Sequence, residues 1–319
     1  MDTISGLHHV TAICSDAQQN LDFYCGTLGL RLVKLTVNFD DPFAYHLYYG
    51  DELGRPGTIL TFFVWQGAQK ARHGNKSVEA TAFAIPSGAL SWWQEHLKSK
   101  NIAFTTPPSR FGESLLQFHD ADGLTLEIIE SERATQGFAW ESGPIPVQYA
   151  IRGLHSVTIA AEATAHTAAL LGGALGFKAS ESSSLLEPNR VRFETGNGIG
   201  SLIDIACLPD APRATTGAGG VHHIAFRVAG DAEQTRLHAV LARDGLNVSP
   251  VMDRSYFRSI YFREPGGVLF EIATDTPGFT VDESAQGLGT GLQLPAQLEA
   301  YRSQIEERVA KIELPHFQK

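Results

Sequence analysis

The chain is poor in cysteine, with three in 319 residues. Cys14, Cys25 and Cys207 lie far apart and show no CxxC spacing, which excludes a disulfide-stapled scaffold and a thiolate metal cluster. Their apolar surroundings are typical of free thiols in a reducing compartment, so we expect a cytoplasmic protein.

Positive charge is also scarce, since 25 Lys and Arg face 35 Asp and Glu, a formal net charge of −10. Nucleic-acid binding needs a basic face, so we expect no nucleic-acid partner. The N-terminus, Met1–Ser5, has no basic region followed by an apolar run, and no apolar stretch approaches the length that spans a bilayer. We therefore expect neither a signal peptide nor a membrane partner.

What the chain does contain is an internal repeat. Gly6–Thr11 (Gly-Leu-His-His-Val-Thr) is matched by Gly153–Thr158 (Gly-Leu-His-Ser-Val-Thr), and Arg55–Phe62 is matched by Glu264–Glu271. Two fainter copies complete four units of about 70 residues, longer than a solenoid repeat and typical of a duplicated supersecondary unit. Hydrophobic periodicity predicts a strand, a helix and three strands in each unit, so the expected fold class is α+β with four βαβββ modules.

The expected boundaries follow from these modules. We expect a first half over residues 1–135, a linker rich in Gly and Pro over 136–150, a second half over 151–277 and a C-terminal loop and helix over 278–319. Helices are expected over roughly 16–28, 88–98, 163–175, 232–244 and 295–312, and one of the later strands near Ser184–Leu186. The last helix carries an apolar stripe, which suggests packing across a domain or against a partner subunit, as in a homodimer.

Two strands of the last module point to a metal site. Side chains alternate faces along a strand, so in Val221–Val228 the residue His223 faces the opposite side from His222, Ile224 and Phe226, which form a core face. The same parity puts His9 and Glu271 on the cavity side. Two imidazoles and one carboxylate on one side of a sheet fit a 2-His-1-carboxylate metal site.

Alignment of the modules gives four His slots and four acid slots. The His slots hold His9, Ala80, Ser156 and His223, and the acid slots hold Phe62, Glu127, Asp204 and Glu271. Only the first and fourth modules supply a slot His. We therefore expect these two modules to pair around the working site, and the second and third to form a matching scaffold without metal.

These motifs carry a family resemblance. The His8–Thr11 opening, the His-His-Ile-Ala-Phe strand and the Gly-Gly-Val-Leu-Phe-Glu ending resemble the vicinal-oxygen-chelate (glyoxalase/bleomycin-resistance/dioxygenase) superfamily. Tyr45–Gly54, Arg110-Phe111-Gly112 and Gly278-Phe279-Thr280 resemble its hydroquinone-type ring-cleaving dioxygenases. The resemblance implies two glyoxalase-like domains with mixed, curved, cup-shaped sheets.

The resemblance also implies an oxidoreductase with a non-haem Fe(II) site at His9, His223 and Glu271, with Mn or Zn as alternative metals. The implied partners are O2 and a small aromatic, a hydroquinone-like or catechol-like ring that opens beside a hydroxyl-bearing carbon, in an extradiol-type reaction. Catalytic positions carried over are His222, Arg254 and Tyr261, with His8 as a further candidate, while Thr11 shares the cavity face with His9. An imidazole or guanidinium there suits proton transfer and charge stabilisation. Strand alternation places His222 on the core face, which conflicts with this role unless the strand bulges.

Other interpretations compete with this one. A glyoxalase-like lyase or isomerase usually uses a fourth protein ligand, and the corresponding slot holds Phe62, which cannot bind a metal. A metal-free module that binds an aromatic compound or a drug would not need His9, His223 and Glu271. In an alternative ligand set, all metal ligands come from the second half of the chain, and His155 takes the place of Ser156. We interpret His155 and His46 as structural residues.

Overall fold

The computed structural model describes residues 4–180 and 189–315. The expected strand near Ser184–Leu186 lies outside these residues. The strands are β1 (Leu7–Cys14), β2 (Arg31–Asn38), β3 (Asp41–Gly50), β4 (Ile59–Val64), β5 (Ser77–Ile85), β6 (Phe104–Thr105), β7 (Leu115–His119), β8 (Thr125–Glu130), β9 (Gly153–Ala161), β10 (Lys178–Ala179), β11 (Arg190–Glu194), β12 (Leu202–Cys207), β13 (Val221–Val228), β14 (Met252–Asp253), β15 (Phe257–Arg263) and β16 (Leu269–Pro277).

The helical elements lie between and after these strands. They are α1 (Ala17–Leu21), η1 (Asp22–Thr27), α2 (Leu90–Ser99), η2 (Glu132–Gln136), α3 (Ala165–Gly172), α5 (Asp231–Arg243), η3 (Phe279–Val281), η4 (Ala296–Tyr301) and α6 (Arg302–Arg308). No helix among residues 4–180 and 189–315 combines the length and the apolar character that a bilayer crossing requires.

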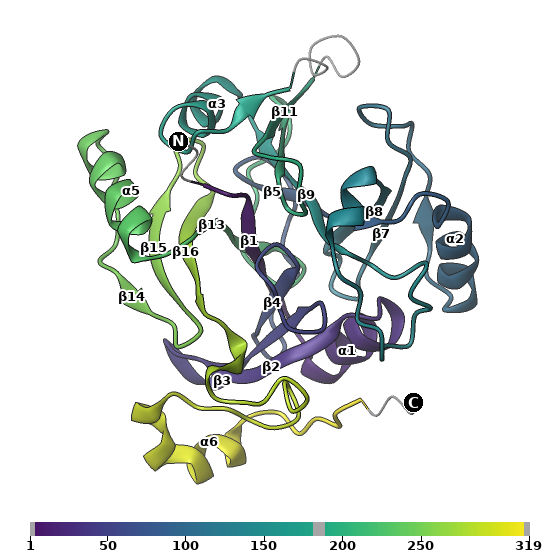
Figure 1. The fold of residues 1–319 in the computed structure, drawn as a ribbon, viewed down its shortest axis with the longest axis vertical. Helices are drawn as coiled ribbons and strands as arrows, with labels where there is room; N and C mark the ends of the chain where they lie inside the picture. The colour runs from purple at the N-terminus through teal and green to yellow at the C-terminus, as the bar shows by residue number, and fades with distance from the viewer. Residues whose placement is uncertain (1–3, 181–188, 316–319) are drawn as a thin grey trace.

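The strands form two mixed sheets of eight strands each (Figure 1). The first has the order β14-β15-β16-β13-β1-β4-β3-β2, and the second the order β10-β11-β12-β9-β5-β8-β7-β6. The four βαβββ modules and the α+β fold class are confirmed. The first module pairs with the fourth and the second with the third, as the His slots predicted, so each sheet draws strands from both sides of residues 136–150.

Each sheet is joined at its centre by a pair of antiparallel strands, β1 with β13 and β5 with β9. A glycine at the start of β1 and of β9 explains part of the repeated motif. Gly6 and Gly153 have φ of +125° and +135°, and a Cβ on Gly6 would lie 2.8 Å from the carbonyl oxygen of Gly200. Only glycine adopts this backbone at such a close approach without strain.

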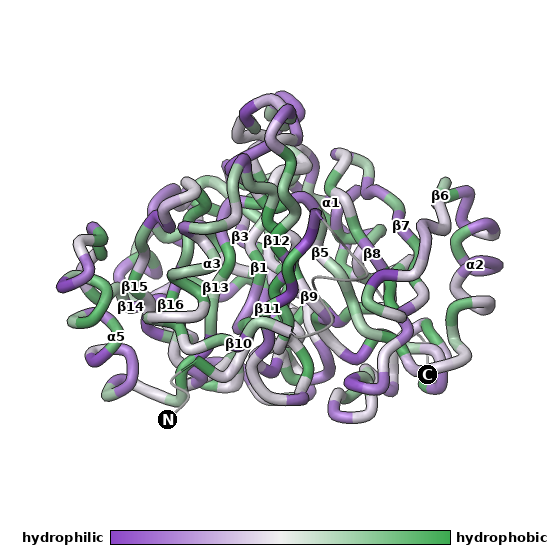
Figure 2. The backbone as a smooth tube through the Cα atoms, turned by 90° about the horizontal axis from the view of Figure 1, so that it is seen from above, coloured by the Kyte–Doolittle hydropathy of each residue, from purple (hydrophilic) through white to green (hydrophobic). Residues whose placement is uncertain are grey.

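Helices cover the outer faces of the sheets, where the core lies. Helix α5 packs against β13, β15 and β16, and α2 packs against β7 and β8. The two helices lie at opposite ends of the molecule in both views (Figures 1 and 2), and the strands between them are mostly hydrophobic (Figure 2). Buried aromatic residues such as Phe62, Phe83 and Phe226 belong to one continuous apolar core.

Two expected helices differ from the structure. The first ends as an α-helix at Leu21 and continues as the π-helix η1 to Thr27, and the last is the 3₁₀-helix η4 followed by a short α6. The expected apolar stripe is split accordingly, because Ile305 and Val309 are buried in the chain's own core while Tyr301 is 54% exposed.

A C-terminal strap, residues 278–294, follows β16 and runs beside β2 and β3, in the yellow-green part of Figure 1. Its Phe279 and Leu288 pack in one apolar cluster with Tyr48 and Val33. Its carboxylates Asp282 and Glu283 both pair with the buried amine of Lys34. The strap therefore occupies part of the concave face of the first sheet.

Candidate metal centre and aromatic pocket

The first sheet brings His9, His223 and Glu271 together at its centre. Strands β1 and β13 run antiparallel, with Thr11 opposite His223, and β16 runs parallel to β13 with Glu271 level with Ala225. The Nε2 atoms of His9 and His223 are 3.4 Å apart, and each lies near Glu271 Oε2, at 3.4 Å and 2.9 Å. All three side chains are buried, and their ligand atoms lie within 4.8 Å of one another.

The His-His pairs owe their arrangement to two β-bulges. In the ladder between β1 and β13, Leu7 pairs with Phe226 and His9 with Ala225, so His8 has no residue opposite it. On the partner strand, Thr11 pairs with His223 and Ala12 with Val221, so His222 is the extra residue. A bulge breaks the alternation of side chains and re-aims one of them.

The prediction that His222 lies on the core face is therefore wrong, because the alternation rule assumes an unbroken ladder. Its ring lies beside that of His223, with the Nδ1 atoms 2.7 Å apart, and it lines the same pocket. His8 repeats the arrangement on the other strand, with its Nδ1 atom 2.9 Å from Nδ1 of His9.

These contacts fix the ring nitrogens that face the centre. Burial and the neighbouring His9 lower the pKa of His8 well below its ordinary value, so His8 is neutral, and it makes a hydrogen bond with the backbone of Thr274. A neutral ring that donates at one nitrogen accepts at the other, so His8 Nδ1 accepts from His9 Nδ1–H. The Nε2 atom of His9 then presents a lone pair toward Glu271.

The carboxylate of Glu271 is charged and incompletely satisfied. Ser259 donates to Oε1, whereas Oε2 is buried without a hydrogen-bond donor. Burial lowers the pKa of His223, which keeps that ring neutral as well.

Buried acceptors that converge without a donor are costly unless a cation satisfies them. The donor set of two neutral imidazoles and one carboxylate is the one that divalent transition metals bind, with coordination positions left for other ligands. The residues present therefore fit a metal ion at this point.

A pocket of about 390 Å³ opens beside these three residues. Its walls are mainly aromatic, and the lining comprises His9, Asn38, Phe39, Asp40, His46, Tyr48, Phe63, Trp65, His222, His223, Ser249, Met252, Arg254, Phe257, Tyr261, Leu269 and Glu271. Aromatic walls with a few converging polar groups are typical of a site for a small apolar ring.

Three of the four expected catalytic residues line this pocket, namely His222, Arg254 and Tyr261. Arg254 Nε donates to the Tyr261 hydroxyl at 3.2 Å, and its Nη2 lies 3.1 Å from Asp40 Oδ2. Burial raises the pKa of Tyr261, so the phenol keeps its proton, while burial lowers the pKa of His222 to about 3.

Thr11, the fourth expected residue, lies beneath the pocket. It is fully buried, and its hydroxyl accepts a hydrogen bond from Thr61 at 2.9 Å. Thr61 in turn contacts Nε2 of His46 at 2.8 Å, and the hydroxyl of Tyr48 lies 3.0 Å from Nδ1 of that ring. Thr11 is thus linked to the pocket through His46.

His46 is a pocket residue that the sequence analysis missed. We interpreted it as an ordinary structural residue, yet its ring lies between Tyr48 and Phe63 and faces the metal pocket. The signal was its alternation with Tyr48 on β3, which repeats the cavity-side parity.

The acid slot of the first module, which the sequence alignment gave to Phe62, belongs to the residue before it. Across the parallel pair of β1 and β4, Thr11 aligns with Thr61 and Ala12 with Phe62. In the fourth module Ala225 aligns with Glu271. Thr11 and Ala225 each lie two residues after the slot His, so the equivalent of Glu271 is Thr61. Phe62 points into the core and packs on Tyr24.

The second sheet replaces the metal centre with ion pairs. Arg110 forms two hydrogen bonds with Glu127, at 2.6 Å and 2.9 Å, and Arg192 forms two with Asp204, at 2.8 Å and 3.0 Å. His155 contacts Glu113 at 3.0 Å. Guanidinium groups thus neutralise the two acid slots, and the rival ligand His155 belongs to the other sheet from His223 and Glu271.

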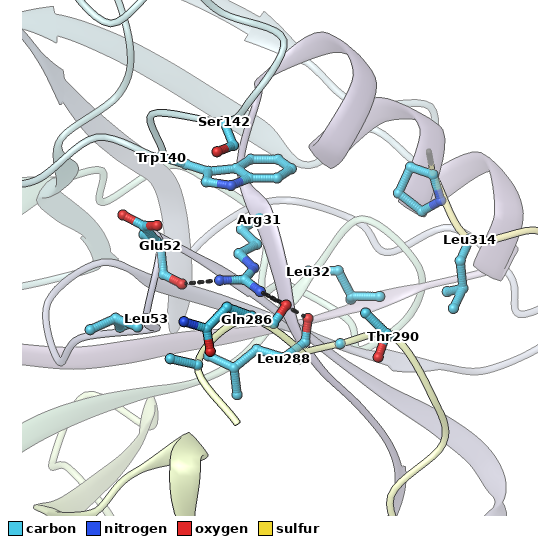
Figure 3. A pocket seen from close by; sticks show the side chains of 13 residues that line it. Arg31, Leu32, Glu52, Leu53, Trp140, Ser142, Gln286, Leu288, Thr290 and Leu314 are labelled. Carbon is cyan, nitrogen blue, oxygen red and sulfur yellow. Dashed lines mark hydrogen bonds between the residues drawn. The ribbon is translucent and has the colours of Figure 1, made fainter. Parts of the chain in front are cut away.

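A further cavity, of about 490 Å³, lies where β2 meets the C-terminal strap (Figure 3). Arg31 points into it below Trp140 (Figure 3), and its guanidinium donates to the backbone oxygens of Glu52 and Gln286 at 2.6 Å and 2.9 Å. Arg31 thus ties β2 to the strap, and the candidate metal ligands lie at the aromatic pocket instead.

Comparison with known proteins agrees with this architecture. The chain is 44% identical over 309 residues to "Putative ring-cleaving dioxygenase MhqO" of Bacillus subtilis (strain 168), covering 97% of both chains. It is 37% identical over 313 residues to "Chlorohydroquinone/hydroquinone 1,2-dioxygenase" of Sphingobium indicum, covering 95% of both.

Solved structures agree as well. A crystal structure described as a putative dioxygenase from Bacillus subtilis superposes with a TM-score of 0.94 at 43% identity, over 99% of this chain and 100% of the other. Glyoxalase I from Zea mays shares the fold, with a TM-score of 0.62 at 14% identity over 85% of this chain and 92% of the other. The sequence profile of one family matches residues 6–128 and 153–272. The chain belongs to the Glyoxalase/Bleomycin resistance protein/Dioxygenase superfamily.

Proposed function

We propose that the chain is a non-haem Fe(II)-dependent, extradiol-type ring-cleaving dioxygenase that acts with O2 on hydroquinone-like or catechol-like aromatics. One observation carries the proposal: the buried, converging acceptors of His9, His223 and Glu271 open onto an aromatic pocket of about 390 Å³. Relatives named as ring-cleaving dioxygenases support the reaction class, and one named for hydroquinone and chlorohydroquinone supports the substrate class.

His9, His223 and Glu271 would hold the metal. When bound, Fe(II) lowers the pKa of a ring hydroxyl and allows electrons to pass from the ring to O2, chemistry that side chains alone cannot supply. Mn(II) is the alternative occupant of the same donor set, and Zn(II) would fit the ligands without supplying redox chemistry.

The pocket walls orient the ring and exclude water. Phe63, Trp65 and Phe257 offer apolar faces on different strands, and a flat ring of hydroquinone size is accommodated between such faces. Exclusion of water strengthens the electrostatic interactions of the polar groups that remain in the pocket.

Arg254, Tyr261 and His222 act on the ring oxygens and their protons. Arg254 keeps its charge and holds the Tyr261 hydroxyl at 3.2 Å, so this pair presents a fixed donor to negative charge that develops on oxygen. Burial lowers the pKa of His222 to about 3, so its ring stays neutral and offers a hydrogen bond to a substrate hydroxyl. His46 and Thr11 position this side of the pocket through Thr61.

The test is O2 consumption by protein reconstituted with Fe(II) under anaerobic conditions. We expect one O2 per hydroquinone and loss of activity in Glu271→Gln. The matched control is Glu127→Gln, the same slot in the second sheet, which should stay active. The proposal fails if the loaded, folded protein consumes no O2 with hydroquinones and catechols, or if Glu271→Gln retains full activity. A Zn(II)-loaded protein that isomerises a hemithioacetal instead would favour the glyoxalase-like alternative.

A further inference from the structure

A second, smaller cavity adjoins the metal pocket. It has a volume of about 140 Å³ and shares two wall residues with that pocket, His222 and Leu269. Its other walls come from Ile13 and from three segments that are distant in sequence, residues 71–78, 214–221 and 263–269. His222 therefore stands between the aromatic pocket and this cavity.

The charge of the cavity is of one sign. Besides His222, its ionisable lining residues are Arg72, His73, Lys76 and Arg263, and no aspartate or glutamate lines it. Within the part of the chain that the structure describes, no carboxylate lies within ion-pair distance of Arg72, Lys76 or Arg263. In a chain of net charge −10, unpaired cations around one hollow are unexpected for a merely solvated surface.

The cations are held by the fold although their ends are exposed. Arg263 Nη1 donates to the carbonyl oxygen of Gly267 at 2.9 Å. Lys76 lies over the same glycine, since a Cβ placed on Gly267 would be 3.5 Å from Lys76 Cδ. Lys76 also has a φ of +67°, a conformation uncommon for residues other than glycine and asparagine, which is frequent at functional sites.

Arg72 completes the arrangement from the opposite segment. Its Nη2 donates to the carbonyl oxygen of Arg213 at 2.8 Å, and its backbone N–H donates to the hydroxyl of Thr215 at 3.0 Å.

We propose that this cavity is a carboxylate subsite of the enzyme, formed by Arg263, Lys76 and Arg72 next to the metal pocket. It rests on the proposed function for the identity of the ring. A ring seated in the aromatic pocket reaches the subsite past His222 and Leu269, so an acidic arm on that ring lies among the cations.

The carboxylate that binds this subsite could belong to either of two molecules, the substrate or the product. One is an acidic substituent on the aromatic substrate. The other is the product, because cleavage of the ring bond beside a hydroxyl-bearing carbon inserts both atoms of O2, leaving a carboxylic acid at that carbon and an aldehyde at its neighbour. The acid releases its proton at neutral pH, and no other oxidant or reductant takes part.

Equilibrium binding to the full-length, Zn(II)-loaded protein separates the sources without turnover. The probes are hydroquinone, 2,5-dihydroxyphenylacetate and cis,cis-muconate, measured by calorimetry at two salt concentrations. We expect the double variant Lys76→Gln/Arg263→Gln to weaken a carboxylate probe about tenfold and hydroquinone less than twofold, at the strength of two exposed charge contacts. The control Arg243→Gln, a cation on α5 paired with Asp244, should change neither.

The outcomes are distinct. Weaker binding of dihydroxyphenylacetate supports a substrate arm, and weaker binding of muconate alone supports the product. If the double variant binds both carboxylates as tightly as the unmodified protein, the subsite is refuted. The proposed function is tested separately. If the unmodified protein consumes no O2, but the double variant Lys76→Gln/Arg263→Gln still binds carboxylates more weakly, the subsite is supported and the dioxygenase proposal is refuted.

Discussion

The Nδ1 atom of His8 lies 2.9 Å from the Nδ1 atom of His9, and His222 and His223 repeat this contact at 2.7 Å. Each proposed imidazole ligand is thus oriented by the histidine that precedes it in the chain. The contact exists because a bulge aims two consecutive side chains to the same side. A hydrogen bond to the second nitrogen of a ligating ring fixes its tautomer and orientation.

The first prediction concerns His8. His8→Phe keeps a buried ring beside Phe257 but removes the acceptor for His9, so we expect metal affinity to fall about 10–100-fold. Chelator competition measures this change. His155→Phe is the control, because His155 holds the equivalent bulge position in the second sheet. Equal metal affinity in His8→Phe and the unmodified protein would contradict the orienting role.

The second prediction concerns Glu271, whose buried Oε2 atom has no hydrogen-bond donor. In metal-free protein, Glu271→Gln supplies an amide donor to the neighbouring imidazoles and removes a buried charge, so it should stabilise the fold by about 1–2 kcal/mol. The same change should abolish tight metal binding. Thermal unfolding with and without metal measures both effects. A metal-free Glu271→Gln protein that melts lower than its parent would show that Oε2 is already satisfied.

Most of the architecture could be predicted from sequence because the repeats carry it. The slots of His9 and His223 predicted which modules pair, and the sheet order confirms that pairing. The bulges could not be predicted, since a one-residue slip depends on the facing strand. That slip accounts for the wrong face of His222, and a similar one-residue ambiguity in short alignments accounts for Phe62 in place of Thr61.

The third prediction concerns acid stability. Burial alone would raise the pKa of Glu113, but its contacts with His155 and Arg192 outweigh burial and lower it to about 2. A carboxyl whose pKa is depressed by folding stabilises the fold above its unfolded pKa, and that stability is lost as pH falls through the folded pKa. We therefore expect a loss of about 2 kcal/mol between roughly pH 5 and pH 2.

Glu113→Gln should flatten this part of the pH profile. Denaturant unfolding at each pH measures the free energy of unfolding, and Glu95→Gln, which changes an exposed helix residue paired with Lys98, is the control. If Glu113→Gln loses as much stability between pH 5 and pH 2 as its parent, the pairing with His155 and Arg192 does not control acid unfolding.

The last prediction concerns the C-terminal strap. Lys34 is fully buried on β2, its amine lies 2.5 Å from Asp282 and also pairs with Glu283, and Asp282 accepts from the Tyr256 hydroxyl at 3.0 Å. Removal of one partner from a buried ion pair leaves uncompensated charge, so Lys34→Met should cost about 3–5 kcal/mol. It should also increase proteolysis within residues 278–294.

A triple variant separates the electrostatic effect of Lys34→Met from its effect on packing. When the acids are neutralised together with the lysine, in Lys34→Met/Asp282→Asn/Glu283→Gln, no charge is stranded and most of the lost stability should return. Lys98→Met, on an exposed pair, should change the free energy of unfolding by less than about 0.5 kcal/mol. Because Phe279 packs on Tyr48, which lines the metal pocket, a loosened strap should also weaken binding of aromatic ligands. If Lys34→Met leaves stability, proteolysis and ligand affinity unchanged, the strap does not depend on this ion pair.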